Sequence, residues 1–364
     1  MKIKEIISVL EQMAPTSYAE DFDNIGLLIG NQENEATGIL VCHDALENVV
    51  DEALAKNCNV IVCFHPIIFS GLKKITGKNY VERVVIKAIQ NNIAIYAVHT
   101  ALDNHKEGVN KIFCDALGLI NTKILVPKQN FIKKLITYTT PENAVEVRNA
   151  LFENGAGKIG NYENCSFNSQ GIGTYMGNKN SNPEIGERFE FVEGNEIKIE
   201  VTFEKHLESK ILKALFNAHV YEEVAYEIYD LQNAHQNIGL GMIGELKNTM
   251  EEKDFLFFVK DKMKVEAIRH SEFTEKPIKK VAVLGGSGSF AIKNAILAGA
   301  DVFLTADLKY HNFYEAENQI LLADVGHFES ERYTKNYIVE FLRKKILNFA
   351  IFLSEENTNP VKYL

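Results

Sequence analysis

The sequence predicts an α/β protein: a two-part α/β core domain interrupted by an inserted α+β domain. Three observations lead to this fold class. The first 125 residues alternate between wholly apolar runs and helical patterns, which is typical of a parallel sheet covered on both faces. A segment with alternating polar and apolar residues follows, and the first pattern then returns. The length of 364 residues is sufficient for two domains.

The N-terminal part supplies the first predicted elements. The opening stretch MKIKEIISVLEQM places Ile3, Ile6, Ile7 and Leu10 on one helix face, so it predicts an amphipathic helix. It lacks the apolar core and cleavage site of a secretion signal. Further along, apolar runs predict strands, and helical spacing predicts the helices between them. The strands are expected at 37–44, 59–66 and 93–100, and the helices at 45–57 and 80–92.

The middle of the chain has a different pattern of polar and apolar residues. Residues 134–157 read as strand, turn and helix, and the Gly- and Asn-rich stretch 155–177 reads as a loop. An alternating segment at 187–205, a helix at 206–219 and a strand at 224–232 follow. The order strand, helix, strand, strand, helix, strand is the ferredoxin-like pattern. We therefore predict an inserted ferredoxin-like domain over 128–234, with 1–127 and 235–364 together forming the core.

The C-terminal part returns to strands separated by helices. Its strands are expected near 279–289, 301–307, 320–327 and 349–354, with helices at 290–300 and 328–347.

Composition narrows the classes of function. The net charge of −10 disfavours nucleic-acid binding, and no apolar run approaches the length of a membrane span. The five cysteines are odd in number and form no CxxC pair, so a disulfide framework or a structural zinc site is disfavoured. This cysteine usage indicates a reducing, cytoplasmic location.

Candidate functional residues gather at the ends of the predicted strands. In open α/β sheets, ligands bind beyond the carboxyl ends of the strands. The residues with chemically active side chains at these ends are His43, Asp44, His65, His99, Thr100, Asp103, Thr305, Asp307, His311, His327 and Glu331.

Four of these residues predict a metal site. His327 and Glu331 are four residues apart at a helix start, so they share one helix face. Two imidazoles, His65 and His327, with two carboxylates, Asp103 and Glu331, suit a divalent transition metal. A carboxylate can also bridge two metals, which favours hydrolysis by a metal-activated water. Taken singly, each residue is better explained as a turn residue or part of a solvated helix start; the joint pattern favours a metal.

The stretch GGSGSFA is a competing signal. Gly286, Gly288 and Ala291 match the G-x-G-x-x-A form of the dinucleotide fingerprint, but the motif lies late in the chain. A phosphate held by the loop amides and a plain strand-to-helix turn remain open. Asp307 and His311, also four apart, are candidates for orienting ligands or substrate.

Several motifs together resemble one family. They are DNIGLLIG (23–30), FHPIIFSGLKKI (64–75), HTALD (99–103), GVN (108–110), GAGKIGNYENCSF (155–167), GGSGS (285–289), ADVFLTADLKYH (300–311) and GHFESE (326–331). In this order they resemble the GTP cyclohydrolase 1 type 2 homologue family, also called the Ngg-interacting-factor-three-like family. The resemblance spans essentially the whole chain. It implies a dinuclear metal centre in a homohexamer, with an insert that resembles the PII and CutA proteins.

The resemblance also implies a ligand set. It gives His65 and Asp103 to one metal, His327 to the other and Glu331 to both. The family's motif has two histidines before the proline, whereas this chain has Phe64 in the first position. Phenylalanine cannot bind a metal, so the second ion lacks one ligand. The neighbouring candidates are His99, which we favour, and His43.

Two hypotheses of function follow. The first is a metal-dependent hydrolase, with one or two Zn, Mn or Fe ions per chain, acting on a nucleotide or related small molecule with His99 as general base. The alternative is a non-catalytic metal-binding or sensor protein that uses the PII/CutA-like insert. Both expect a cytoplasmic homohexamer without membrane or nucleic-acid partners.

Overall fold

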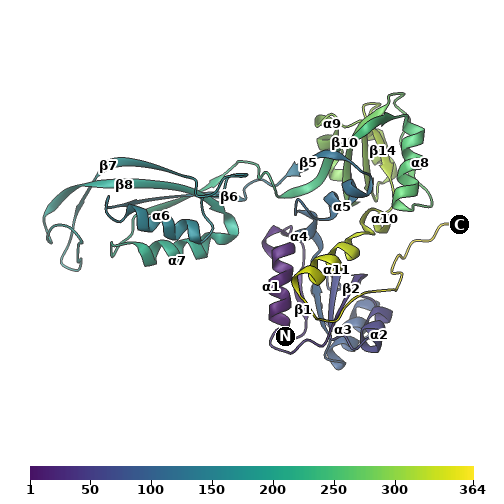
Figure 1. The fold of residues 1–364 in the computed structure, drawn as a ribbon, viewed down its shortest axis with the longest axis horizontal. Coiled ribbons are helices and arrows are strands. Elements are labelled where there is room, and N and C mark those ends of the chain that lie inside the picture. The colour runs from purple at the N-terminus through teal and green to yellow at the C-terminus, as the bar shows by residue number, and fades with distance from the viewer. The chain divides into compact units, whose positions relative to one another are not determined.

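The computed structural model describes all 364 residues. It separates into two compact units (Figure 1). Residues Met1–Pro127 and Asn237–Leu364 form the first, here called the core unit, and residues Lys128–Gln236 form the second, called the inserted unit. No helix has the length and apolar composition that crossing a bilayer requires.

The first sheet of the core unit has five strands in the order β1-β4-β3-β2-β15. All neighbours are parallel except the edge strand β1. Successive strand residues enter opposite cores: Ile39 and Val41 pack with helices α1 and α11, while Leu40 and Cys42 pack with α2 and α3. The predicted α/β pattern with helices on both faces is confirmed here. The bounds are α1 (Ile3–Met13), β1 (Gly26–Ile29), β2 (Ile39–Asp44), α2 (Glu47–Ala55), β3 (Val60–His65), α3 (Tyr80–Gln90), β4 (Ala94–Ala97), α11 (Thr334–Lys345) and β15 (Ile351–Leu353).

The core unit contains a second sheet of six strands, which the sequence patterns did not predict as a separate sheet. Its order is β11-β14-β13-β12-β10-β5, and only β12, β13 and β14 run parallel to one another. Helices α5 and α8 pack on one face and α9 on the other. The bounds are α5 (Val109–Ala116), β5 (Ile120–Pro127), β10 (Gly239–Met250), α8 (Glu252–Met263), β11 (Arg269–His270), β12 (Ile278–Ser287), α9 (Ile292–Leu297), β13 (Val302–Ala306) and β14 (Leu321–Asp324).

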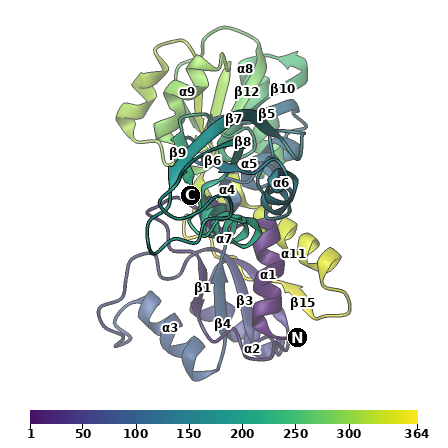
Figure 2. The same cartoon turned by 90° about the vertical axis from the view of Figure 1, so that its left-hand side faces the viewer.

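The two sheets form separate lobes of the core unit. Figure 2 shows the first sheet below, in purple and blue, and the second above, in green. The short helix α4 (His99–Asp103) and helix α5 follow the first sheet in the chain and lead into the second. The chain also has four short 3-10 helices: η1 (Thr16–Tyr18), η2 (Lys205–Leu207), η3 (Ser289–Ala291) and η4 (Tyr310–Ala316). Of these, η2 belongs to the inserted unit and the others to the core unit.

The single helix predicted at 328–347 is wrong. The structure has α10 (His327–Glu331) and α11, separated by a turn at Arg332 and Tyr333. The Arg332 guanidinium donates to the carbonyls of Met263 and Lys264, and the Tyr333 hydroxyl donates to that of Lys262. These carbonyls end α8 and lack helical partners, so the turn satisfies them. Because of this break, α10 continues from β14 of the second sheet, while α11 packs against the first sheet.

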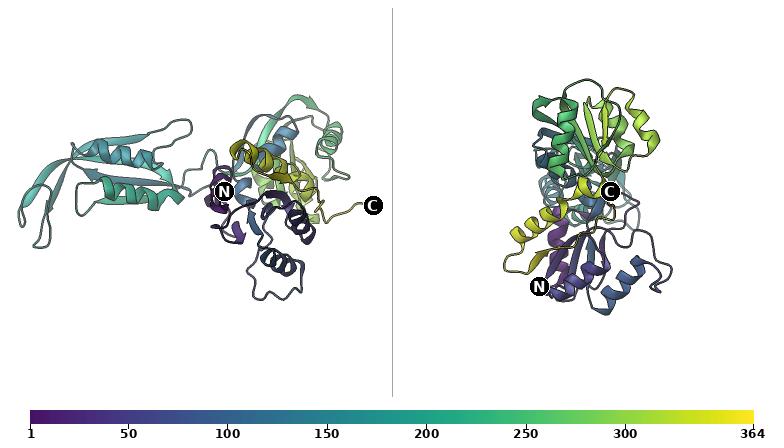
Figure 3. Two further views of the ribbon diagram at one scale, coloured as in Figure 1. Left: turned by 60° about the horizontal axis from the view of Figure 1, so that its bottom comes forward. Right: turned by 90° about the vertical axis from the view of Figure 1, so that its right-hand side faces the viewer.

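The inserted unit has the element order β6, α6, β7, β8, α7, β9. Its sheet order is β7-β8-β6-β9, and every neighbouring pair is antiparallel. Helices α6 and α7 share one hydrophobic core with the sheet and lie on one face of it (Figure 3). The bounds are β6 (Ile132–Thr139), α6 (Ala144–Glu153), β7 (Ser166–Met176), β8 (Phe191–Glu204), α7 (Glu208–Ala218) and β9 (Tyr226–Leu231).

The loop predicted at 155–177 is wrong in its second half, where β7 lies. This strand pairs with β8 over its full length, from Ser166 opposite Val201 to Met176 opposite Phe191. Its side chains are mostly exposed, so no apolar face marks it in the sequence. Its Gly, Asn and Ser residues also have low strand propensity, which pairing with a long neighbour overrides.

Candidate metal centre

Three chain segments of the core unit bring the candidate site together. Strand β2 ends on His43 and Asp44, and its parallel neighbour β3 ends on His65, which lies in register with Asp44. The third segment is α10, whose first and last residues are His327 and Glu331. Because the carboxyl ends of parallel strands meet at one sheet edge, the histidines of β2 and β3 lie next to each other.

Three imidazoles converge on one carboxylate oxygen. The Oε2 atom of Glu331 lies 3.3 Å from Nε2 of His43, 3.3 Å from Nε2 of His65 and 3.4 Å from Nε2 of His327. The Nε2 atoms of His65 and His327 are 3.4 Å apart. The potential ligand atoms of His65, His327 and Glu331 thus lie close enough together to hold one ion.

These separations fit a metal ion better than direct hydrogen bonds. Donor atoms that each lie about 2.1 Å from a tetrahedral zinc ion are about 3.4 Å from one another. The imidazole-to-carboxylate distances have this value, whereas a charge-assisted hydrogen bond is normally about 2.8 Å long. The donor set, imidazole nitrogen and carboxylate oxygen, also suits zinc and the neighbouring transition metals.

Unpartnered buried atoms give independent support for a cation. The Oε2 atom of Glu331, both ring nitrogens of His43 and the Oδ1 atom of Asp103 are buried without a hydrogen-bond partner. A buried polar atom without a partner costs about 1–3 kcal/mol, and a charged one costs more. Burial and the negative charge of Glu331 raise the pKa of Asp103 well above its usual range. A cation bound between Glu331 and His43 would remove the cost at Oε2 of Glu331 and at Nε2 of His43.

Two outer carboxylates orient the imidazoles. Asp44 accepts a hydrogen bond from Nδ1 of His65 at 2.8 Å, and Asp307 accepts one from Nδ1 of His327 at 2.7 Å. Asp44 is held in turn by the hydroxyl of Thr358, which donates to it at 2.6 Å. A carboxylate on Nδ1 places the free electron pair on Nε2, the usual arrangement of a metal-binding histidine.

The charges of the cluster shift its protonation equilibria. Burial alone would lower the pKa of His65, but its hydrogen bond to Asp44 and the charge of Glu331 raise it to about 10. Burial would raise the pKa of Glu331, yet the facing imidazoles of His327, His43 and His65 hold it well below its usual range. In the absence of a metal, therefore, protons on the imidazoles balance the buried carboxylate.

The predicted site residues are distributed as follows. His65, His327 and Glu331 form one group of potential metal ligands, and His43, Asp44 and His65 form another. Asp103 belongs to neither group; it ends α4, with its side chain buried and its carbonyl accepting a hydrogen bond from Asn110.

His99 belongs to neither group. It lies not in a strand, as predicted, but at the start of α4, where its Nδ1 bonds to Asp23 at 2.9 Å. The His99 ring centroid is 5.3 Å from that of His65, so it borders the cluster.

Other candidates lie away from the cluster. His311 packs beside the rings of Tyr310 and Tyr314. Cys63 is fully buried in the core between the first sheet and helices α2 and α3, and its thiol donates to a backbone carbonyl. Lys73 and Lys74 are exposed.

The GGSGS loop allows α10 to pack closely against it and is not arranged to bind a phosphate. The amide of Gly285 donates to the side chain of Asn110, and that of Gly286 donates to the hydroxyl of Ser330. A Cβ atom on Gly286 would lie 2.5 Å from Oε1 of Glu331. Two amides that a phosphate would need are thus already paired, and the structure favours the close-turn interpretation over the dinucleotide fingerprint.

This packing gives a first prediction, tested with Gly286→Ala. The residue has φ +70°, and its new methyl group would push the Glu331 carboxylate out of place. Gly118→Ala is the matched control, because Gly118 has φ +66° and no atom within 4 Å of its Cβ position. We expect Gly118→Ala to cost about 1 kcal/mol in the free energy of unfolding, and Gly286→Ala more than about 3 kcal/mol, with weaker zinc binding. Equal effects in denaturant unfolding would contradict this role of Gly286.

A cavity of about 370 Å³ opens beside the cluster. Its wall includes the cluster residues His43, His65 and His327 together with Arg269 and Tyr363, the second-last residue of the sequence. A small molecule in this cavity would therefore touch the converging imidazoles.

The fold and this cluster define an α/β protein with a candidate divalent-metal centre at the carboxyl ends of its strands. A model of the family described as Duf34/NIF3 (NGG1p interacting factor 3) matches residues 1–360, and the chain belongs to this family.

Relatives support this membership over the full length. A Bacillus subtilis protein named GTP cyclohydrolase 1 type 2 homolog is 39% identical over 99% of this chain and 98% of its own. A Staphylococcus epidermidis protein of the same name is 37% identical over 100% of both chains. The crystal structure of a Bacillus cereus protein related to NIF3 has a TM-score of 0.83 at 37% identity, covering 100% of this chain and 99% of that one. The resemblance predicted from the motifs is thus confirmed at the level of the family.

Proposed function

We propose that the core unit is a metal-dependent hydrolase that acts on a nucleotide or a related small molecule, as a homohexamer in the cytoplasm. His65, Asp103, His327 and Glu331 would hold one or two divalent ions, Zn, Mn or Fe. The observation that supports the proposal most strongly is the convergence of imidazole nitrogens on Oε2 of Glu331. The name shared by the relatives, GTP cyclohydrolase 1 type 2 homolog, supports the substrate class.

The chain's own residues suit a hydrolytic role. A divalent metal bound here would supply Lewis-acid chemistry and an activated water. His99 would act as the general base, because Asp23 holds its Nδ1 and leaves Nε2 to take up a proton. The adjacent cavity would hold the substrate next to the cluster.

The hydrolase proposal predicts a loss of turnover in Asp103→Asn. The substitution keeps the volume of the buried side chain but removes its negative charge, which the proposed metal site needs. We expect at least a 100-fold loss of kcat in an assay that detects hydrolysis of GTP and other nucleotides by the zinc-, manganese- or iron-loaded protein. Asp115→Asn, an exposed carboxylate on α5 paired with Lys111, is the matched control and should retain full activity.

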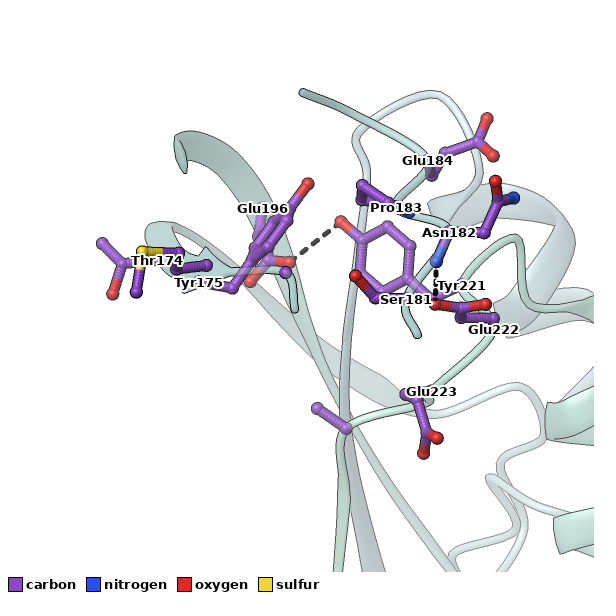
Figure 4. A pocket seen from close by; sticks show the side chains of 13 residues that line it. Thr174, Tyr175, Ser181, Asn182, Pro183, Glu184, Glu196, Tyr221, Glu222 and Glu223 are labelled. Atoms are coloured by element: carbon purple, nitrogen blue, oxygen red, sulfur yellow. Dashed lines mark hydrogen bonds between the residues drawn. The ribbon is translucent and has the colours of Figure 1, made fainter. Parts of the chain in front are cut away.

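The alternative is a metal-binding sensor that uses the inserted unit. Its β-α-β-β-α-β order supports a ferredoxin-like, PII/CutA-like domain. This unit contains a cavity of about 300 Å³ (Figure 4), where the Tyr221 hydroxyl donates to Glu196 at 2.9 Å and the Asn182 amide donates to Glu222. Its lining includes four glutamates and no basic residue, so it suits a cationic or neutral ligand rather than a nucleotide.

One comparison separates the two functions. If Asp103→Asn leaves every detected activity unchanged, the hydrolase proposal fails. A cationic ligand of the inserted unit that changes zinc affinity in calorimetry would then favour the sensor.

A further inference from the structure

We infer that His43 supplies the metal ligand that Phe64 removes, so that the second ion of the centre is held by a histidine from the neighbouring strand. The inference rests on the proposed metal centre, and it assigns a residue to which neither the motifs nor the relatives give a role. It also reverses our expectation that His99 would be the replacement.

The strand register places His43 beside Phe64. Strands β2 and β3 are parallel, with Cys42 opposite Cys63 and Asp44 opposite His65. His43 and Phe64 lie between these pairs, at neighbouring positions on adjacent strands. Adjacent strands are about 4.8 Å apart, so side chains at paired positions of parallel strands start side by side. The ring centroids of His43 and Phe64 are 5.4 Å apart.

His43 is buried without any hydrogen-bond partner for its ring. Its exposed fraction is 3%, and neither Nδ1 nor Nε2 has a hydrogen-bond partner. The other cluster histidines, His65 and His327, each have a carboxylate on Nδ1. A histidine that served only packing would leave two buried polar atoms unsatisfied, which is costly. A cation at Nε2 accounts for one of them.

The orientation of the ring fits ligation. Nε2 of His43 lies 3.3 Å from Oε2 of Glu331, the same separation that His65 shows from that oxygen. The ring is held by Phe64 and by Phe328, whose ring centroid is 5.0 Å away. Aromatic packing therefore holds the His43 ring in place, whereas a carboxylate holds each of the rings of His65 and His327. The distance between Nε2 of His43 and Oε2 of Glu331 matches that between two ligands of one tetrahedral ion.

His99 is less suited to this role. Its Nδ1 is bound to Asp23, and it has no contact with Glu331 comparable to that of His43. It borders His65 and remains in position for the proton transfer proposed above.

The test is the number of zinc ions per chain in four proteins. Wild type is compared with His43→Leu, with the double variant His43→Leu/Phe64→His and with the control His311→Leu, whose histidine lies outside the cluster. Each protein is stripped, reloaded with zinc, desalted and measured by elemental analysis, with circular dichroism as the check on folding. We expect two ions in wild type and control, one in His43→Leu, and two again in the double variant, where the histidine is restored on β3.

The outcomes separate the inference from the proposed function. A wild type that holds no zinc defeats the proposed metal centre itself. A wild type with two ions and a folded His43→Leu that also keeps two overturns the role of His43. If His43→Leu does not fold, the anomalous zinc signal in crystals of the wild type decides. An ion within about 2.1 Å of Nε2 of His43 supports the inference, and ions bound only elsewhere overturn it.

Discussion

Glu331→Gln is expected to abolish tight zinc binding and, with it, the stabilisation that zinc gives. All three converging Nε2 atoms share the Oε2 atom of Glu331, so one substitution affects every ion that the cluster would hold. Glutamine has nearly the same shape but carries no charge, and a neutral amide is a poor ligand for zinc. At a zinc concentration 1,000 times the dissociation constant, the wild type should gain about 4 kcal/mol in the free energy of unfolding for each ion bound. The variant should gain less than about 1 kcal/mol.

Glu329→Gln is the matched control. Glu329 lies in the same short helix and is also buried, but it accepts a hydrogen bond from Asn359 and faces no imidazole of the cluster. Denaturant unfolding of both variants, with and without zinc, separates loss of the ligand from damage to α10. Equal stabilisation of the wild type and Glu331→Gln by zinc would contradict the proposed centre.

Local patterns were enough to predict the parallel strands of the first sheet, but not its antiparallel edge strand β1. The strands at 37–44 and 59–66 are apolar throughout because both faces are buried, and β2 and β3 lie within these ranges. In the second sheet the buried strands β12, β13 and β14 gave the same signal, but β5 and β10 did not. Strand β5 is largely exposed, and β10 contains several glycines, so neither has a clear apolar pattern. Their pairing depends on contacts between residues more than 100 positions apart, such as Leu240 with Val126.

The site was predictable where its geometry is local. His327 and Glu331 share a helix face, and their spacing alone indicated that they lie together. The position of His43 beside Phe64 depends on strand register, which spacing along the chain does not give. His99 was expected at a strand end. Instead the chain turns into α4 there, with φ +20° at His99, and Asp23 binds the ring. The contact of His99 with Asp23, 76 positions away, cannot be predicted from the local sequence pattern.

Zinc binding is expected to release at least one proton per chain at pH 8, the one that His65 carries. Its pKa is raised to about 10, by the hydrogen bond to Asp44 and the charge of Glu331, so the metal-free protein carries this proton at pH 8. A metal binds only the neutral imidazole and must displace it. Release of this proton alone should raise apparent zinc affinity up to about tenfold per pH unit until pH approaches 10. Calorimetry in two buffers of different ionisation enthalpy measures the released protons.

Asp44→Asn should reduce this proton release, because it removes the hydrogen bond that most raises the pKa of His65. Asp51→Asn replaces an exposed carboxylate of α2 that pairs with Lys87, and it should leave the proton release unchanged.

The stability of the metal-free protein should show the opposite dependence on pH. The folded pKa of His65 lies above its unfolded value of about 6.5, so its contribution to stability is complete below pH 6.5 and disappears as pH rises through about 10. Its upper limit is about 5 kcal/mol. Zinc-loaded protein, whose His65 carries no proton, should not lose stability over this range, and parallel losses with and without zinc would show that the metal does not bind His65.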